Sequence, residues 1–423
     1  MKKIVLTMAL LNHGSIQAKS LYEIANEASH SSHAIKKEKA NSQVMESRVT
    51  DAKSSLFPRL SVQTEGTKPV QKDLSTEYRQ RTVSSRIRLE QPLYDAASFN
   101  LINKQSIDLD RSQNREIITH QRILSDVSLQ YLDCARMVSE LEVPRDIRAD
   151  LEVEKSSVEK RIELGIATAI DLMNIDLQIE QWSMEESRLD SEIQSSLIQI
   201  ASLSNTDIGS CDLGVKTGYS KQISLLPFPS NKDLRDRPSL KDQIFEKELA
   251  QEEKRLNYRS LLPRFYVFAD KQHSIFGDEQ SEQNDIGMGL TWTLSGNSIT
   301  GPASASRQIA ATEIQIQENI SMSKLAIEQK EKELRAAAAM SLSFQSAIEK
   351  NRELLAAQTK LHKLGQQDFL EVLRTRRNLS ALRRRHVQLE FGVLALYIQY
   401  LQTREVTSLE HIRNLSLEGV LSI

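Results

Sequence analysis

Few side chains of this 423-residue chain stand at spacings that could support chemistry. His30 and His33 lie three residues apart on an expected helix and could share a metal ion, but no third or fourth ligand is near them in the sequence. We therefore expect a solvated pair and no cofactor. The sequence has no phosphate-binding loop, no nucleophile elbow and no His-Glu-x-x-His motif, so it predicts no enzyme.

Cys134 and Cys211 are the only cysteines, and an exported chain could join them in an oxidising compartment. At about 1.5 Å per helical residue, Cys134 lies about 45 Å from an expected turn at Gly165. The segment that carries Cys211 begins about 50–55 Å from the same turn. These similar heights permit a disulfide but do not require one, because the two side chains can lie on different helix faces.

The first residues are typical of a secretory signal peptide. Lys2 and Lys3 precede the apolar run Ile4–Leu11, and a polar stretch then ends in the small residue Ala18. We expect cleavage after Ala18. A short amphipathic first helix is the alternative.

The composition favours long amphipathic helices. Only 14 Gly and 9 Pro interrupt the chain, which is 26% charged and 39% hydrophobic. A net charge of −2 argues against a nucleic-acid partner. The longest later apolar stretch, Phe391–Leu401, is shorter than the roughly 18 residues of a membrane-spanning helix.

The chain repeats itself about 200 residues apart. Ser55–Val62 returns as Ser260–Val267, and Leu164-Gly165 returns as Leu364-Gly365. Two matches in the same order and at nearly the same offset indicate a tandem duplication.

Each half contains two segments in which apolar and polar residues alternate. The clearest is 285–294, and 60–65 and 83–90 have the same pattern. Such alternation suits a strand between lipid and water. Four strands cannot close a barrel, which needs about eight, so several copies of the chain would have to contribute. A soluble four-stranded sheet packed on helices is the alternative.

Each half also predicts a lead-in helix, a very long helix and a returning helix. Their expected ranges are 31–57, 96–163 and 171–204 in the first half, and 231–262, 303–362 and 368–402 in the second. Pro144 should kink or divide the first long helix. Lead-in and returning helices could stack end to end beside the long one, giving four columns of about 90 Å in a tube wall.

The expected divisions follow from these elements. They are a signal peptide 1–18, a first repeat 19–205, an inter-repeat segment 206–230, a second repeat 231–402 and a C-terminal tail 403–423. The inter-repeat segment and the tail would form an equatorial collar halfway along the tube. A flexible linker and a flexible tail are the alternative.

An export signal, this duplicated plan and Leu-Gly turns followed by an acidic residue together resemble the TolC-like outer membrane efflux and secretion factors. The run Gln91–Asp95 is similar to the family's strand-to-helix junction, whereas Thr293–Gly296 lacks its proline. The resemblance implies a mainly α fold with a small β part. Long antiparallel helical hairpins would form an α-barrel, and three copies would supply four strands each to a twelve-stranded transmembrane β-barrel.

The resemblance also implies a function. A homotrimer would lie in outer membrane lipid with a large periplasmic portion, as the passive exit duct of a tripartite export system. Its partners would be a periplasmic membrane-fusion adaptor and an inner-membrane pump of ABC, RND or MFS type. Type I protein secretion and small-molecule efflux fit equally, and a non-channel periplasmic coiled-coil protein is the alternative from a different class.

By the same resemblance, the turns at Gly165 and Gly365 would form the closed periplasmic tip. Asp171 matches an acidic position that helps to hold the tip closed, and Glu371 matches one that lines its narrowest ring. An acidic residue near a helix start also stabilises the first-turn amides, and this interpretation stands beside the gating one.

The partners of Asp171 differ from the family's. His362 and Gln367 stand where the family often has Tyr and Arg, so the same Asp-to-Arg clasp cannot form. A hydrogen bond from neutral Gln367 would contribute about 1 kcal/mol or less, against roughly 1.5–3 kcal/mol for a charged one. We expect a weaker lock.

Two basic runs follow the second turn. They are Arg374, Arg376 and Arg377, and then Arg383–Arg385. Consecutive residues point in different directions on a helix, so the runs favour solvated faces over adaptor docking or anion preference.

Overall fold

The computed structural model describes most of the chain after the expected signal peptide. The described residues are 19–67, 82–165, 167–211, 234–276, 279–293, 296–364, 366 and 369–415. The signal peptide 1–18 and most of the inter-repeat segment lie outside them. The chain divides into two compact units. The hairpin unit takes its residues from 1–37, 117–237 and 322–423, and the sheet unit from 38–116 and 238–321.

The two halves of the chain have the same plan of helices. They comprise α3 (Ala96–Glu163) with α4 (Ala169–Ser204), and α7 (Gly296–Lys363) with α8 (Phe369–Arg404). Both α3 and α7 have 68 residues, and both α4 and α8 have 36. The long helix 96–163, the hairpins and the tandem duplication are therefore confirmed.

Three of the predicted helices differ from the observed ones at or near a proline. Pro144 does not divide α3, and α7 begins seven residues before 303, with Pro302 inside it. One proline removes a single hydrogen bond, and the bonded turns around it maintain the helix. The second lead-in helix, α6 (Pro238–Arg259), is shorter than 231–262. Pro238 suits the first helical position, and Pro263 disfavours helix in the residue before it.

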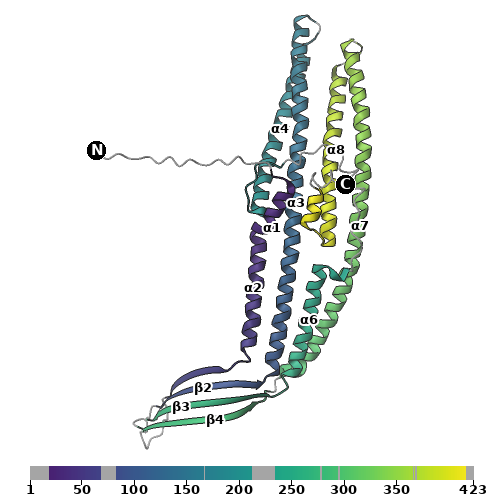
Figure 1. Ribbon diagram of the computed structural model, residues 1–423. Helices are drawn as coiled ribbons and strands as arrows, with labels where there is room; N and C mark the ends of the chain where they lie inside the picture. The colour runs from purple at the N-terminus through teal and green to yellow at the C-terminus, as the bar shows by residue number, and fades with distance from the viewer. Residues whose placement is uncertain are drawn as a thin grey trace, which may run out of the picture. The chain divides into compact units, whose positions relative to one another are not determined.

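The sheet unit contains four antiparallel strands in the order β1-β2-β3-β4 (Figure 1). The strands are β1 (Arg59–Thr67), β2 (Thr82–Tyr94), β3 (Arg264–Phe276) and β4 (Glu279–Thr291). The lead-in helices α2 (His33–Ser54) and α6 precede the two strand pairs. In the subunit, β1 and β4 are the edge strands.

The strand register gathers apolar side chains on one face of the sheet. Leu60 pairs with Leu89, and Val267 pairs with Met288. Ile286 and Met288 are 92% and 80% exposed. The opposite face carries charged and aromatic groups, including Arg88, whose guanidinium carbon lies 4.5 Å from the centroid of the Phe268 ring.

Two glycines of β4 make room for aromatic rings on that polar face. A Cβ on Gly287 would lie 2.9 Å from Cζ of Phe268, and a Cβ on Gly289 would overlap the ring of Tyr266. The rings therefore lie across β4, where a larger residue would displace them.

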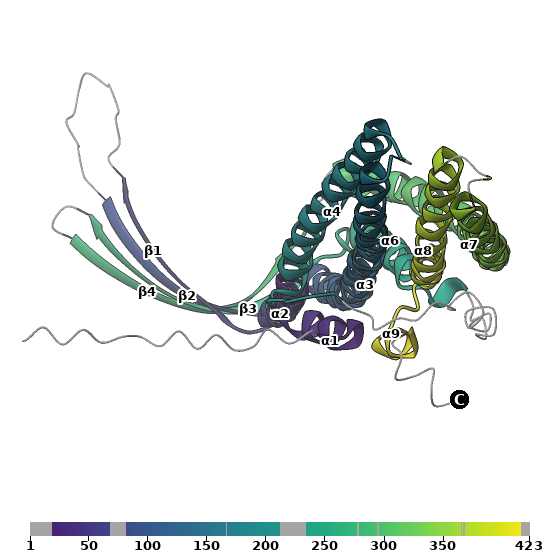
Figure 2. The same ribbon diagram turned by 90° about the horizontal axis from the view of Figure 1, so that it is seen from above.

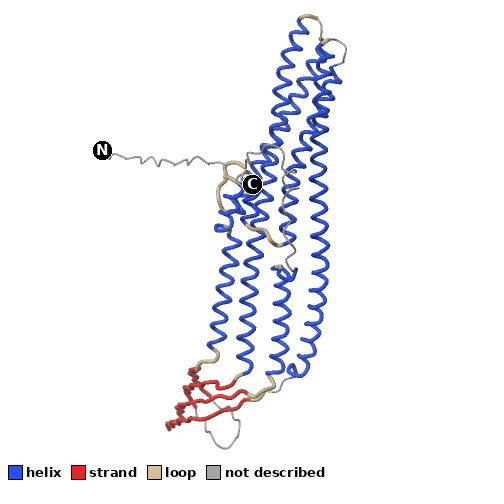
Figure 3. Tube along the Cα trace, turned by 45° about the vertical axis from the view of Figure 1, so that its right-hand side comes forward, coloured by secondary structure: helices blue, strands red, loops and turns tan. Residues whose placement is uncertain are grey.

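The hairpin unit contains α3 from Ile117 on, α7 from Met322 on, and all of α4 and α8, together with α1 (Leu21–Ser31) and α9 (Leu409–Leu415) (Figures 2 and 3). Its main core is drawn from α1, α3, α4, α7, α8 and α9, together with Ile35 of α2 and Cys211. Tyr131 and Tyr400 are fully buried within it. The helix α1 contacts both α4 and α9, so part of the C-terminal tail is ordered against the start of the described chain.

Cys134 and Cys211 form a disulfide, with 5.9 Å between their Cα atoms. Both are fully buried in the main core. The bond attaches the start of the inter-repeat segment to α3. Among the described residues, no helix is both long and apolar enough to cross a membrane.

Candidate gate at the hairpin turns

Thr168 and Asp171 cap the start of α4. Oδ2 of Asp171 accepts hydrogen bonds from the Thr168 backbone N at 2.9 Å and from Thr168 Oγ1 at 2.8 Å. The Asp171 backbone N donates to Thr168 Oγ1 in return, at 3.3 Å, which completes a capping box. The interpretation of Asp171 as a helix-start residue is confirmed. Its role in a gate stays a prediction.

The same contacts set the charge of Asp171. The backbone and side-chain hydrogen bonds from Thr168 lower the pKa of the carboxyl below its ordinary value. The nearby Arg161 and His362 lower this pKa further. Asp171 is therefore held ionised beside two basic groups from both hairpins.

Gly165 ends α3 in the left-handed conformation. Its φ is +75°, and its N donates to the carbonyl of Ile162 at 2.9 Å. No atom lies within 4 Å of the place of a Cβ, so the backbone angle, and not crowding, favours glycine here. Gly365 lies outside the described residues, and its turn stays a prediction.

Arg161 joins the two hairpins close to their turns. Its Nη1 donates to Nε2 of His362 at 3.0 Å, and its Nη2 donates to Glu154 at 2.9 Å. Sequence reasoning looked for a cation near the second glycine and missed Arg161, which precedes the first. Its place in the last turn of a helix, where a basic residue is favourable, was the available signal.

The remaining predicted gate residues are only partly placed. Glu371 lies in the first turn of α8, where Oε1 accepts from Nη1 of Arg374 at 2.6 Å. Gln367 lies outside the described residues, so its hydrogen bond to Asp171 is untested. That Glu371 lines the narrowest ring also stays a prediction.

The second basic run does not form a solvated face throughout. Arg383 donates to Asp146 on α3 at 2.9 Å, and Arg384 donates to Glu185 on α4 at 3.0 Å. Both side chains are about one-third exposed, so they remain in contact with solvent while they reach across to the other hairpin. Arg385 is exposed.

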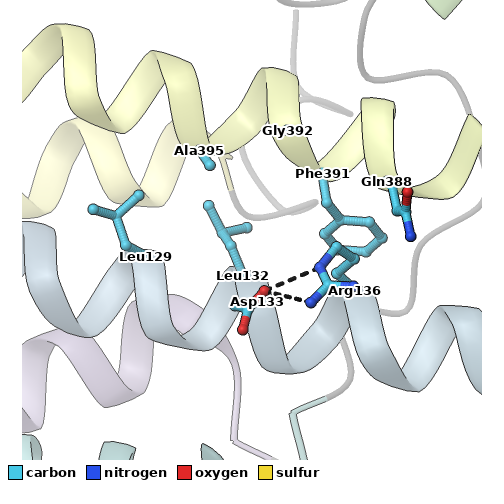
Figure 4. A pocket seen from close by; sticks show the side chains of 8 residues that line it. All are labelled: Leu129, Leu132, Asp133, Arg136, Gln388, Phe391, Gly392 and Ala395. Atoms are coloured by element: carbon cyan, nitrogen blue, oxygen red, sulfur yellow. Dashed lines mark hydrogen bonds and ion pairs between the residues drawn. The ribbon is translucent and has the colours of Figure 1, made fainter. Parts of the chain in front are cut away.

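A groove of about 350 Å³ lies between α3 and α8 in the hairpin unit (Figure 4). It is lined by Leu129, Leu132, Asp133 and Arg136 of α3 and by Gln388, Phe391, Gly392 and Ala395 of α8. Nothing lies within 4 Å of the place of a Cβ on Gly392, and the pair Asp133–Arg136, 2.7 Å apart, forms a polar rim. An apolar groove with such a rim could receive side chains from a partner helix.

Both hairpins also expose apolar side chains at helical spacing. On α4, Ile170 and Met173 are 69% and 70% exposed, and Leu177 continues the row. On α7, Leu354 and Leu361 lie seven residues apart and are exposed as well. Such rows are typical of surfaces that another helix covers.

No protein-family model and no curated protein sequence matches the chain. Solved structures match over nearly its full length. The outer-membrane channel OprN is 12% identical with a TM-score of 0.77, over 92% of this chain and 90% of that one. The Campylobacter jejuni outer membrane channel CmeC is 10% identical, with a TM-score of 0.74 over 94% and 89%. The outer membrane protein VceC from Vibrio cholerae is 14% identical, with a TM-score of 0.73 over 91% and 96%.

Proposed function

We propose that this chain, which has the fold of the TolC-like outer membrane efflux channels, is the outer-membrane exit duct of a tripartite export system. The observation that carries the proposal is the combination of two long helical hairpins with a four-stranded sheet that exposes one apolar face. The match to channel structures over more than nine-tenths of the chain supports it. The duct would lie in the outer membrane with a large periplasmic portion and would conduct passively.

A homotrimer is the assembly we propose. Four strands with open edges at β1 and β4 cannot close, and unsatisfied backbone groups are not tolerated in lipid. Three copies would supply twelve strands with no open edge, and the exposed apolar rows of α4 and α7 would be covered between neighbouring copies. The apolar sheet face would contact lipid tails.

The groove between α3 and α8 is our candidate for an adaptor contact. Its apolar floor, its open position at Gly392 and its rim Asp133–Arg136 suit the tip of an α-helical hairpin. A periplasmic membrane-fusion adaptor would occupy it and connect the duct to an inner-membrane pump. Small-molecule efflux and type I protein secretion share this arrangement, and the pump determines the cargo.

Charge on the apolar sheet face tests the proposal. A Lys at a lipid-facing position near the bilayer midplane costs about 2–4 kcal/mol, so Met288→Lys should reduce insertion into the outer membrane. Gln283→Lys is the matched control, because Gln283 lies on the polar face of the same strand, bonded to Asp285. Membrane fractionation measures how much of each variant reaches the outer membrane, and gel electrophoresis of unheated samples measures how much of it is trimeric.

In planar bilayers the wild-type trimer should conduct ions. A soluble periplasmic monomer, unaffected by either lysine, would instead support the coiled-coil structural protein and end the proposal.

A further inference from the structure

Two consecutive arginines of α8 form ion pairs with both helices of the other hairpin. Nη2 of Arg383 lies 2.9 Å from Oδ2 of Asp146 on α3, and Nη1 of Arg384 lies 3.0 Å from Oε1 of Glu185 on α4. We call these four residues the α8 clamp. Asp146 is 19 residues before Gly165, so the clamp lies about 28 Å from the turn and is separate from the candidate gate there.

On α4, the carboxylate of Glu185 is held in position and ionised by other contacts besides the one with Arg384. Glu185 already accepts hydrogen bonds from Arg188 of its own helix, at 2.9 and 3.0 Å. These bonds are the main cause of a lowered pKa for Glu185, and the charge of Arg384 adds to it. Trp182, one turn before Glu185, has its ring centroid 5.5 Å from the Arg384 guanidinium carbon. Arg384 therefore meets a fixed carboxylate and an aromatic face together.

On α3, the clamp lies beside a weak point of the helix. Pro144 stands two residues before Asp146 and has no N–H to donate to the carbonyl of Glu140. Arg145 and Arg148 both pair with Glu186 of α4, at 2.9 and 3.5 Å. The end of α3 after Pro144 is thus attached to α4, and the two can move together.

Apolar packing holds this end of the hairpin to α8 only weakly. The small apolar cluster at this level has five buried members from α3 and α4 among the described residues, and only Leu373 from α8. A hollow of about 240 Å³ lies next to this part of α3 and is lined by Val143, the residue before the proline, by Arg383 and His386 of α8, and by residues of α7. Little apolar contact would be lost if the hairpin end moved away.

We infer that α3 bends at Pro144 and that the α8 clamp holds the α3/α4 hairpin end in the closed position of the duct. This inference rests on the proposed function. Opening would separate Arg383 and Arg384 from Asp146 and Glu185, while α3 and α4 stay joined through Glu186. The clamp thereby sets how readily the duct opens, independently of the contacts at Asp171.

Single-channel recording of the full-length trimer in planar bilayers tests the inference. Each pair is partly exposed, and exposed pairs shift an equilibrium by up to about fivefold. Arg384→Glu removes one attraction and adds a repulsion, so we expect the open fraction to rise several-fold. Arg385→Glu makes the same charge change at the exposed neighbouring residue and should leave the open fraction unchanged.

Two further variants separate the clamp from a general loosening of the protein. The charge exchange Arg384→Glu with Glu185→Arg should return the open fraction toward that of the wild type. Pro144→Ala restores the missing donor and stiffens α3, so it should lower the open fraction in the Arg384→Glu background.

The outcomes distinguish the two proposals. If the wild type forms no conducting channel, the proposed function fails and the clamp with it. If the wild type conducts and Arg384→Glu forms intact trimers with an unchanged open fraction, only the clamp is wrong. Should Arg384→Glu fail to assemble, Asp146→Asn gives the same measurement from the α3 side, with a smaller expected rise, because it removes one attraction and adds no repulsion.

Discussion

At the scale of single residues, the start of α4 shows how one carboxylate can have two roles. Asp171 completes a capping box with Thr168, and it also lies near Arg161 and His362 from the two hairpins. The cap is local to α4, whereas the basic neighbours connect it electrostatically to α7. A substitution at Asp171 therefore has two effects: it weakens the start of α4, and it weakens the attraction between the two hairpins.

We predict that Asp171→Ala destabilises the protein by about 0.3–1 kcal/mol, because the start of α4 loses the carboxylate of its capping box. The pKa of Asp171 is lowered in the folded state, so its stabilisation is fully present above the ordinary Asp value of about 3.9 and is lost as the pH falls below it. Thermal unfolding of wild type and variant at pH 7 and pH 3 measures both effects, and the difference between them should shrink at pH 3.

Channel recordings distinguish the two roles of Asp171, because only a role in the gate would change the fraction of time that the duct is open. If Asp171 also holds the duct closed, Asp171→Ala should raise the open fraction in planar bilayers. Unchanged closure together with a lower melting temperature would leave Asp171 as a cap alone.

A second prediction at this scale concerns the glycine at position 289. Gly289→Ala would place a methyl group against the Tyr266 ring, and overpacking of this kind costs about 1–3 kcal/mol. Gly66→Ala is the control, because a Cβ at Gly66 meets nothing within 4 Å. Thermal unfolding of the two variants compares them, and equal unfolding temperatures would show that the Tyr266 ring moves aside at no cost in free energy.

At the scale of elements, the disulfide attaches the inter-repeat segment to a helix 77 residues earlier. Closing a loop of this length stabilises a protein by about 4 kcal/mol in the chain-entropy view. We predict that a reducing agent lowers the unfolding temperature of the wild type. The double variant Cys134→Ser, Cys211→Ser should unfold at about the temperature of the reduced wild type, and a reducing agent should not change that temperature. A wild type with two titratable thiols after unfolding without reductant would contradict the bond.

The elements were largely predictable from the sequence, and their mutual contacts were not. The bounds of α3, the hairpins and the alternating strands followed from period and length. The partners of Arg161, Arg383 and Arg384 did not, because small departures from 3.6 residues per turn accumulate along helices of 36 and 68 residues. The face that each arginine presents to its neighbour is therefore set by packing, as is the pairing of Cys134 with Cys211.

At the scale of the whole molecule, the proposed function implies that a single subunit has surfaces that are covered only in the assembled protein. Its sheet has two edges, one apolar face is exposed, and apolar rows run along α4 and α7. Every one of these surfaces would be covered by lipid or by another copy in the trimer. The measurements on Met288→Lys and on the α8 clamp both act at this scale, because each requires the assembled protein.

The open edges β1 and β4 have a consequence for a subunit that has not yet assembled. An edge strand beside an exposed apolar face is a template for pairing with any other extended chain, so a lone subunit is prone to aggregate. If the proposed trimer forms, lowering the rate of synthesis should increase its yield, because fewer unassembled subunits would be present at once to pair along their open edges.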